Sequence, residues 1–303
     1  METPPRYTRP LKTGPSKPSG AHAEIGIFLR EFRYTSLFES QPSPESADSV
    51  AGLLRSGRSI LRFSEYRPSP KACNEAASVL LDLLRKHLPD CAEALRRIQE
   101  ALAVGEIPPE DLVSHAFRDQ FEDILAAAQR LGVDEELFAG ITVFLARPFR
   151  GQAAQDLIQG VDLRGWLRGH CPVCGHLPVL AHIQSAAGLR TLWCLHCGTN
   201  WPFARLECPY CLNENQEELE LIGAEDEPSC WAHACAGCGK YIKEIKSYLP
   251  ADGFPFEEFY LETHASDLLA RDVGFAPQGL FAVAAWSPEG EEEVPRSGET
   301  THE

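Results

Sequence analysis

Four Cys-x-x-Cys pairs constrain this chain more than any other feature of its sequence. Their cysteines are Cys171, Cys174, Cys194, Cys197, Cys208, Cys211, Cys235 and Cys238. A two-residue spacer lets a tight turn present two thiolates to one ion, and two such turns complete a tetrahedron around it. We therefore predict two metal sites with these eight cysteines as ligands.

The spacing of the pairs indicates which of them share an ion. Nineteen residues separate the first pair from the second and twenty-three separate the third from the fourth, whereas ten separate the second from the third. The longer spacers suit hairpins, so we predict that the first pair joins the second and the third joins the fourth; spacing alone leaves a crossed arrangement open. A glycine follows three of the pairs, where it can adopt positive φ. Leu212 holds that place after the third pair, and we expect a looser turn there.

Other uses of the cysteines fit this chain less well. It has 303 residues and eleven cysteines, whereas disulfide scaffolds are typical of short secreted chains. A thioredoxin-like pair would begin a helix, and the sequence predicts no helix directly after any pair. Zinc, a single iron and an iron–sulfur cluster all accept four thiolates, and sequence alone slightly favours zinc. Because catalytic zinc keeps a position open for water and both quartets are closed, we predict a protein without catalytic residues that is not an enzyme.

Residues near the pairs are expected to be structural. They are His170, His176, His196, His233, Trp193, Trp201 and Cys230, with Cys73 and Cys91 further away. Eight thiolates already fill two tetrahedra, so the histidines are predicted to be surface or supporting residues. The tryptophans are expected to cover a small core. The three other cysteines are expected to be small packed residues or, for Cys230, a spare thiol.

The sequence before the cysteine pairs predicts helices. Apolar residues recur at helical spacing over 69–105, where Pro89 is expected to divide the segment, and again over 109–132. A third helical pattern begins at Asp134 and is expected to be interrupted by Pro148. No single helix is long or apolar enough to stand alone, so we predict an irregular bundle.

The cysteine-rich half predicts strands. Short apolar runs at 179–183, 189–193 and 241–245 lie between the pairs, and helical periodicity returns over 255–273. The predicted fold class is α+β, with an irregular helical domain, two small tandem four-cysteine modules and a C-terminal helix. The predicted divisions are a flexible arm (1–22), the helical domain (23–165), the first module (166–206), the second module (207–250), the C-terminal helix (251–275) and a disordered acidic tail (286–303).

Charge and hydropathy limit the partners and the location. The formal net charge is −16, from 28 basic and 44 acidic residues, and residues 171–250 carry five Lys or Arg against nine Asp or Glu. Such a surface offers no basic stripe for phosphate, which disfavours a zinc-ribbon protein that binds nucleic acid. No run of about 18 apolar residues and no signal-peptide core is present. We expect a cytoplasmic protein that is not an integral membrane protein.

Longer motifs around the pairs resemble a known family. They are Cys171-Pro172-Val173-Cys174-Gly175, Gly188-Leu189-Arg190, Cys194-Leu195-His196-Cys197-Gly198-Thr199-Asn200-Trp201, Ala204-Arg205-Leu206-Glu207-Cys208 and Cys235-Ala236-Gly237-Cys238-Gly239-Lys240-Tyr241-Ile242-Lys243, with a weaker match at Ala146-Arg147-Pro148-Phe149. In these motifs the chain resembles the formate dehydrogenase accessory protein family, FdhE, over roughly residues 145–275. It departs from the family pattern at His176, at Leu212 and at the C-terminal end.

The resemblance implies a fold and a function. Members of the family are cytoplasmic assembly factors that associate with the catalytic subunit of molybdenum- or tungsten-dependent formate dehydrogenases. They have a helical domain followed by two rubredoxin-like modules, which implies one iron ion in each four-cysteine site, with zinc as the alternative. The Cys-Pro-x-Cys-Gly form of the first pair resembles rubredoxin as well. The resemblance leaves open a second hypothesis, in which the iron is redox-active and acts on the partner's cofactor site.

Overall fold

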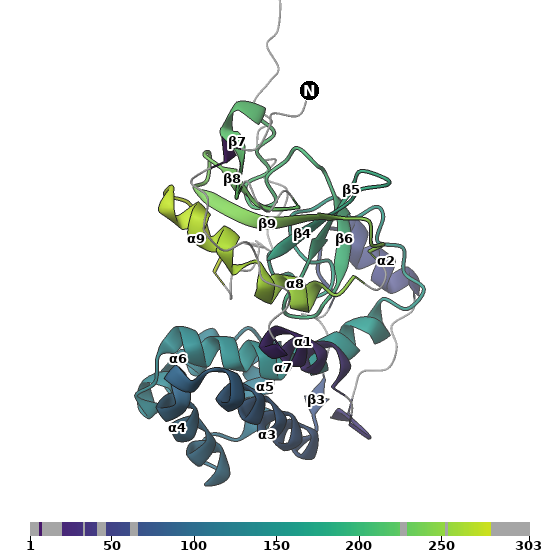
Figure 1. Ribbon diagram of the computed structural model, residues 1–303. Helices are drawn as coiled ribbons and strands as arrows, with labels where there is room; N and C mark the ends of the chain where they lie inside the picture. Colours follow the sequence, from purple (N-terminus) through teal and green to yellow (C-terminus); the bar gives the residue numbers. More distant parts are fainter. Residues whose placement is uncertain are drawn as a thin grey trace, which may run out of the picture.

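The computed structural model describes residues 6–7, 20–32, 34–40, 47–60, 66–224, 229–251 and 254–279. In this part of the chain the fold has two halves, a group of packed helices and a twisted sheet that carries both cysteine quartets (Figure 1). The predicted α+β fold class is confirmed. Most of the predicted arm and the whole predicted acidic tail lie outside the described residues, and the predicted domain divisions remain predictions.

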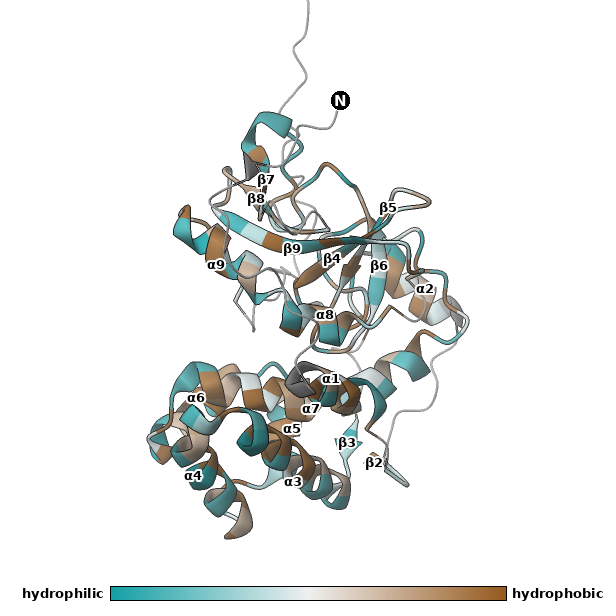
Figure 2. Cartoon of the chain, in the orientation of Figure 1, coloured by the Kyte–Doolittle hydropathy of each residue, from teal (hydrophilic) through white to brown (hydrophobic). Residues whose placement is uncertain are grey.

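Seven helices of the described chain come before the cysteine pairs. They are α1 (Gly20–Glu31), α2 (Ala47–Arg55), α3 (Pro70–His87), α4 (Ala92–Ala103), α5 (Pro109–Phe117), α6 (Phe121–Leu131) and α7 (Glu135–Leu157). A small antiparallel pair, β2 (Phe38–Ser40) and β3 (Arg67–Pro68), lies beside them. As expected, α3 stops before Pro89, and a 3-10 turn at Pro89–Cys91 leads into α4. The apolar segments of α3, α5 and α7 gather in the middle of this half (Figure 2).

The helices depart from the predicted pattern at two places. The segment 109–132 forms two helices, because Asp119 adopts a φ of 56° between α5 and α6. The expected interruption at Pro148 was wrong, since α7 runs through it to Leu157. A proline inside a helix costs about 3 kcal/mol. Leu145 and Phe149, close to Pro148 in α7, are buried among α1, α3, α5 and α6. Burying two such side chains contributes roughly 1.5–3 kcal/mol each, which outweighs the cost of the proline.

The second half contains one sheet. Its strands are β1 (Arg6–Tyr7), β4 (Leu180–Gln184), β5 (Leu189–Trp193), β6 (Asn200–Phe203), β7 (Leu219–Gly223), β8 (Cys230–Cys235), β9 (Lys240–Ser247) and β10 (Ala276–Pro277). The order is β1-β7-β8-β9-β4-β5-β6, and β10 pairs with the start of β9. The three predicted strands correspond to β4, β5 and β9.

The sheet consists of two antiparallel three-stranded units joined side by side. The strands β4, β5 and β6 form the unit of the first two cysteine pairs, and β7, β8 and β9 form that of the last two. The strands β4 and β9 pair in parallel from Leu180 opposite Lys243 to Gln184 opposite Ser247. The two four-cysteine modules therefore share backbone hydrogen bonds and form one continuous sheet.

Two short helices follow the sheet where one was predicted. They are α8 (Phe256–Glu262) and α9 (His264–Asp272), which meet at Thr263. Helix α9 packs on the β7–β9 unit, and α8 packs against α1 at the junction of the two halves (Figure 1). Arg30 of α1 forms an ion pair with Glu258 of α8 at 2.7 Å. The C-terminal helices thus connect the sheet to the helical half.

Candidate metal centres

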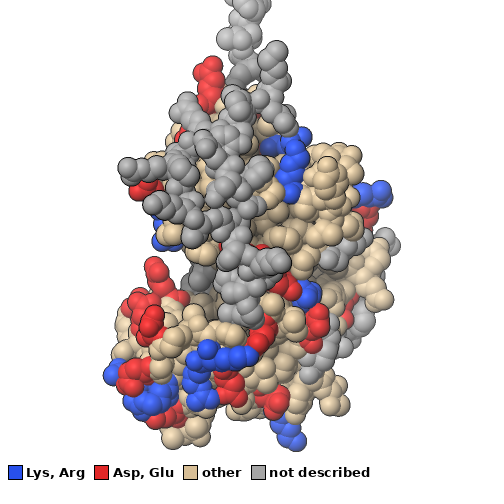
Figure 3. Space-filling view, viewed as in Figure 1, with Lys and Arg blue, Asp and Glu red and all other residues tan. Residues whose placement is uncertain are grey.

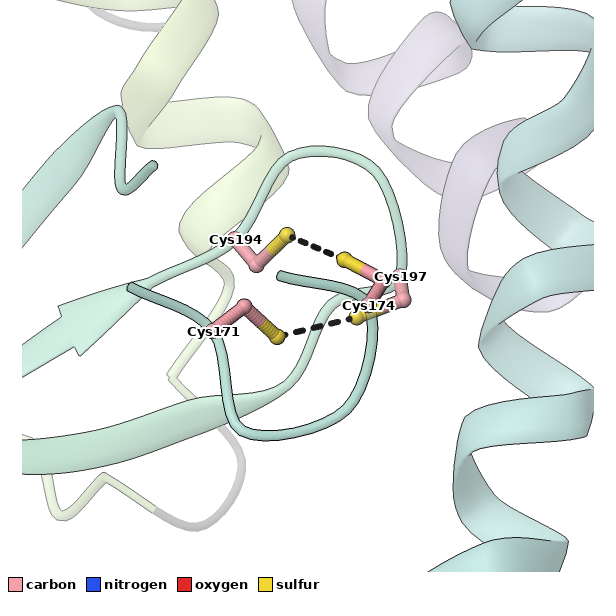
Figure 4. A group of neighbouring side chains, drawn as sticks. All are labelled: Cys171, Cys174, Cys194 and Cys197. Atoms are coloured by element: carbon pink, nitrogen blue, oxygen red, sulfur yellow. Dashed lines mark hydrogen bonds between the residues drawn. The ribbon is translucent and has the colours of Figure 1, made fainter. Parts of the chain in front are cut away.

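The first four-cysteine site is closed and buried. Cys171, Cys174, Cys194 and Cys197 are at most 3% exposed, and their sulfurs all lie within 4.8 Å of one another. The Sγ atoms are 3.5 Å apart between Cys171 and Cys197 and 3.4 Å apart between Cys174 and Cys194. Figure 4 shows the four side chains converging from two facing turns.

The second site has the same plan and lies closer to the surface. Its sulfurs are 3.8 Å apart between Cys208 and Cys238 and 3.7 Å apart between Cys211 and Cys235. Cys211 is exposed and Cys238 is half-buried, whereas the other two cysteines are buried. The predicted joining of first pair with second, and of third with fourth, is confirmed by these two groups.

The spacing of the sulfurs fits a tetrahedral ion. Four sulfurs about 2.3 Å from a central metal lie about 3.8 Å from one another. The second site has this spacing, and the first is a few tenths of an ångström tighter along the two pairs given above. Both groups of sulfurs are therefore able to hold a metal ion.

The same backbone turn builds all four knuckles. The amides of Gly175, Gly198, Leu212 and Gly239 donate to the carbonyl of the first cysteine of each pair, with N···O distances of 2.9–3.0 Å. Their φ angles are 78°, 71°, 59° and 69°. The expectation of a looser third turn was wrong, because Leu212 adopts the left-handed conformation of the glycines. That conformation costs a residue with a side chain about 1–2 kcal/mol.

Burial and hydrogen bonding shift the thiol pKa values. Burial raises the pKa of Cys171 and Cys174 well above the ordinary value. Burial also acts on Cys197, but hydrogen bonds from the other three thiols and from Thr199 bring its pKa well below the ordinary value. In the second site burial raises the pKa of Cys211 to about 11. Since four thiolates cannot be buried together without a compensating cation, the donor set of the first site fits a thiolate-bound ion such as iron or zinc.

The histidines near the first site support its turns. His176 and His196 are buried, and their rings stack with centroids 3.6 Å apart. His176 Nε2 lies 3.3 Å from Asp119 Oδ1, and its Nδ1 lies 3.3 Å from Arg150 Nη1. Neither ring belongs to the four-donor groups found in the described residues.

The tryptophans near the second pair are buried, as expected. Trp201 donates from Nε1 to the Arg168 carbonyl at 2.9 Å. Trp193 stacks on Phe256 of α8, with ring centroids 4.9 Å apart. Trp193 directly precedes Cys194, so this contact connects the first four-cysteine group to the C-terminal helices.

The remaining cysteines pack away from the two groups. Cys73 of α3 is buried and Cys91 is half-buried. Cys230 of β8 is buried, with its Sγ 3.2 Å from Ser266 Oγ of α9. These positions agree with the structural roles expected from the sequence.

Buried arginines are the site residues that sequence reasoning missed. Arg147 and Arg150 of α7 are at most 6% exposed and reach the two turns of the first site. Arg147 Nη2 donates to Glu257 Oε1 of α8 at 2.6 Å. The signal available in the sequence was the Arg-Pro-Phe motif that contains Arg147, which was read for resemblance and helix breaking rather than for charge.

A third buried arginine joins the two modules. Arg190 of β5 donates to the carbonyls of Ala204 and Glu207, at 3.0 and 2.8 Å, and Glu207 directly precedes the second site. Its Nε lies 2.8 Å from Glu244 Oε2 of β9. Although burial acts in the opposite direction, Arg190 and the hydrogen bonds of His233 and Trp231 lower the pKa of Glu244 to about 2. This ion pair therefore stays charged and fixes the first module against the second.

These observations define an α+β protein with two tetrathiol sites in a shared sheet. A family model described as "FdhE, central domain" matches residues 170–205, which contain the first site. The "Protein FdhE homolog" of Actinobacillus pleuropneumoniae serotype 3 is 23% identical over 279 residues, covering 91% of this chain and 86% of the relative. That of Aquifex aeolicus is 33% identical over 116 residues, covering 36% of this chain and 40% of the relative.

A solved structure shows the same fold. The crystal structure of the FdhE protein from Pseudomonas aeruginosa superposes with a TM-score of 0.51 at 18% identity, covering 89% of this chain and 87% of that one. These matches confirm the resemblance of this chain to the FdhE family over most of its length. Within the described residues, none of the helices has the length and apolar character needed to span a bilayer.

Proposed function

We propose that this protein is a non-enzymatic assembly factor for the catalytic subunit of a molybdenum- or tungsten-dependent formate dehydrogenase. The observation that carries the proposal is the pair of tetrathiol sites in a chain that resembles the FdhE family. Both sites are closed by four protein ligands, and such sites serve folding and recognition rather than turnover. The protein acts in the cytoplasm, where the partner subunit is completed.

Each site binds one metal ion, and the ion is iron, with zinc as the alternative. The ligands of the first ion are Cys171, Cys174, Cys194 and Cys197, and those of the second are Cys208, Cys211, Cys235 and Cys238. Binding contributes folding free energy on the order of 10 kcal/mol per site. When bound, the ions fix the knuckles, and the knuckles order the sheet surface that the partner recognises.

The charge distribution supports a protein partner over nucleic acid. On the face drawn in Figure 3, Lys and Arg side chains are interspersed with Asp and Glu. Arg190 and Lys243, two of the basic residues of the sheet, are buried in ion pairs. Phosphate binding would need several basic side chains along one exposed surface.

Affinity purification tests the proposed role. The tagged protein is purified without oxygen from its own host, and mass spectrometry identifies what is bound to it. We expect the formate dehydrogenase catalytic subunit to be recovered by the wild type and by Cys91→Ser, a half-buried cysteine outside both sites. Cys171→Ser and Cys208→Ser should recover little of it. Unchanged recovery and metal content in both of these variants would contradict the role of the sites.

The exposure of Cys211 favours a second candidate function. An iron ion with a ligand at the surface can exchange electrons with a bound partner, so the second site would adjust the redox state of the partner's cofactor site. This candidate predicts a visible absorbance change on reduction and loss of assembly activity when zinc replaces iron. Full activity of the zinc form would eliminate it.

A further inference from the structure

The side chain of Arg147 lies against the second turn of the first site. A Cβ atom built on Gly198 would overlap Arg147 Nη2 and lie 2.6 Å from its Cζ, and one built on Gly151 would overlap its Nη1. Gly151 is on the same helix, one turn further on. Two glycines therefore open the space that the guanidinium occupies, and Gly198 directly follows the ligand Cys197.

The environment of Arg147 points to an electrostatic role. The residue is 6% exposed, and within the described part of the chain its Nε atom has no hydrogen-bond acceptor. The Nη2 atom donates to Glu257 of α8 and also lies against Gly198, in the turn that carries the buried thiols of Cys194 and Cys197.

Charges alternate outward from the first site. The thiolates come first, then Arg147, then Glu257, and then Arg30 of α1, whose Nη1 is 3.9 Å from Glu257 Oε2. Arg147 lies against Gly198, which directly follows Cys197, and Glu257 contacts the guanidinium. A divalent ion with four thiolates has a net charge of −2, and burial leaves its attraction to a nearby guanidinium weakly screened.

The second site has a negatively charged neighbour, whereas the first has the positively charged Arg147. A Cβ atom built on Gly237 would lie 3.0 Å from Glu218 Oε2 and 3.6 Å from Cys235 Sγ, so this carboxylate faces the knuckle. Asn213 Nδ2 lies between them, donating to Glu218 Oε2 at 2.7 Å and to Cys235 Sγ at 3.5 Å. The two tetrathiol sites are therefore placed in contrasting electrostatic surroundings.

We propose that Arg147 is a positioning residue that supplies the counter-charge of the first site and makes that site retain its ion. The inference rests on the proposed metal binding at Cys171, Cys174, Cys194 and Cys197. Glu257 holds the guanidinium in place and offsets part of its charge. The first ion is then a permanent part of the fold, and the second is the exchangeable one.

Metal release from the zinc-loaded full-length protein tests this inference. A chromogenic chelator, 4-(2-pyridylazo)resorcinol, reports release, and Cys211→Ser identifies the phase that belongs to the second site. We compare Glu257→Gln with the double variant Arg147→Gln/Glu257→Gln. They differ only in the guanidinium, and neither leaves a buried carboxylate without its arginine.

If the charge of Arg147 retains the first ion, removing Glu257 and then removing Arg147 should change the release rate of that ion in opposite directions. Glu257→Gln should slow the first-site phase below the wild-type rate, because the guanidinium is no longer offset. The double variant should release that ion about tenfold faster than Glu257→Gln, a factor that corresponds to about 1.4 kcal/mol. Arg147→Lys, which keeps the charge in the wild-type background, should stay within about threefold of the wild type. The second-site phase should be the same in all of these proteins.

The outcomes separate this inference from the proposed function. A wild type that takes up no zinc would refute metal binding itself. Two release phases in the wild type, with equal first-site rates in Glu257→Gln and the double variant, would overturn only the role of Arg147. If Arg147→Lys releases the first ion about tenfold faster than the wild type, the contact is steric and the charge account fails. This comparison uses no Glu257 variant, so it also decides the matter if thermal unfolding shows that the Glu257 variants do not fold.

Discussion

The first four-cysteine site is part of the molecular core, whereas the second lies near the surface, where β8 turns into β9, although the same knuckle builds both. The cysteines of the first site belong to the apolar cluster that also contains Leu80 and Phe149 of the helical half. The segment after α2 covers it from another side, since Ile60 N donates to Pro172 O at 3.1 Å and Ser59 Oγ to Cys171 O at 3.1 Å. In the second site Cys211 and Leu212 remain exposed.

The difference shows that one cysteine pattern can be placed in two different surroundings, one buried and one partly exposed. An ion in the first site would fix two turns that pack in one cluster with side chains of the helices, so its loss would affect the junction of the two halves. An ion in the second site would hold two knuckles and their hairpin. We therefore expect the first site to dominate stability and the second to be the more accessible to other molecules.

Removing one ligand from each site should give the largest contrast. Cys171→Ser should lose the first ion and most of the folding free energy that it contributes, on the order of 10 kcal/mol, so that the helical half also unfolds at lower temperature. Cys211→Ser removes an exposed cysteine, and the resulting unfolding should be confined to the second hairpin, so the midpoint of unfolding of the helical half should fall far less. Metal analysis and thermal unfolding followed by circular dichroism would measure both; equal losses in the two variants would end the distinction between the core site and the surface site.

Two glycines at equivalent places allow a finer comparison. Gly198 and Gly239 have φ angles of 71° and 69°, but a Cβ on Gly198 would overlap Arg147, whereas one on Gly239 would meet no atom within 4 Å. Gly239→Ala should cost about 1–2 kcal/mol through backbone strain alone. Gly198→Ala should cost about 2 kcal/mol more, because a buried charge must move. Denaturant unfolding of the two variants measures this difference. Equal losses in the free energy of unfolding would mean that the Arg147 side chain moves aside without an energetic cost.

The sequence predicted the sites better than it predicted their surroundings. The eight cysteines and the favoured joining of their pairs were predicted from spacing along the chain, which is a local property, and the three glycines after the pairs mark the turns directly. Arg147 and Pro148 were misread because their meaning depends on tertiary contacts. The apolar packing of α7 overrides the helix-breaking tendency of Pro148, and a lone arginine in a helical pattern carries no sign that it will be buried against Gly198 and Glu257.

Replacing Leu212 with glycine, the residue that the other three knuckles have at this place, should stabilise the third knuckle. Leu212 is 50% exposed and adopts a φ of 59°. In Leu212→Gly the relief of left-handed strain, about 1–2 kcal/mol, exceeds the added entropy of the unfolded chain, about 0.4–1 kcal/mol. We expect a net gain of up to about 1 kcal/mol in the free energy of unfolding, with Leu206→Gly, another exposed leucine, as the control that gains nothing. A loss of stability in Leu212→Gly would show that the leucine makes a contact that outweighs its strain.

Glu218→Gln should have the smallest effect, and it tests the electrostatics of the surface site as the Arg147 variants test those of the core site. Its carboxylate faces the Gly237 knuckle and accepts from Asn213, but it is exposed, so solvent and salt screen its repulsion of the thiolates. We expect Glu218→Gln to slow release of the second ion about twofold at low ionic strength, to have no effect at about 1 M salt, and to leave release of the first ion unchanged. Glu220→Gln, an acidic neighbour on β7, is the matched control. Faster release in Glu218→Gln would instead mean that the carboxylate acts by orienting the Asn213 amide toward Cys235, and the contrast in charge between the two sites would then be confined to Arg147.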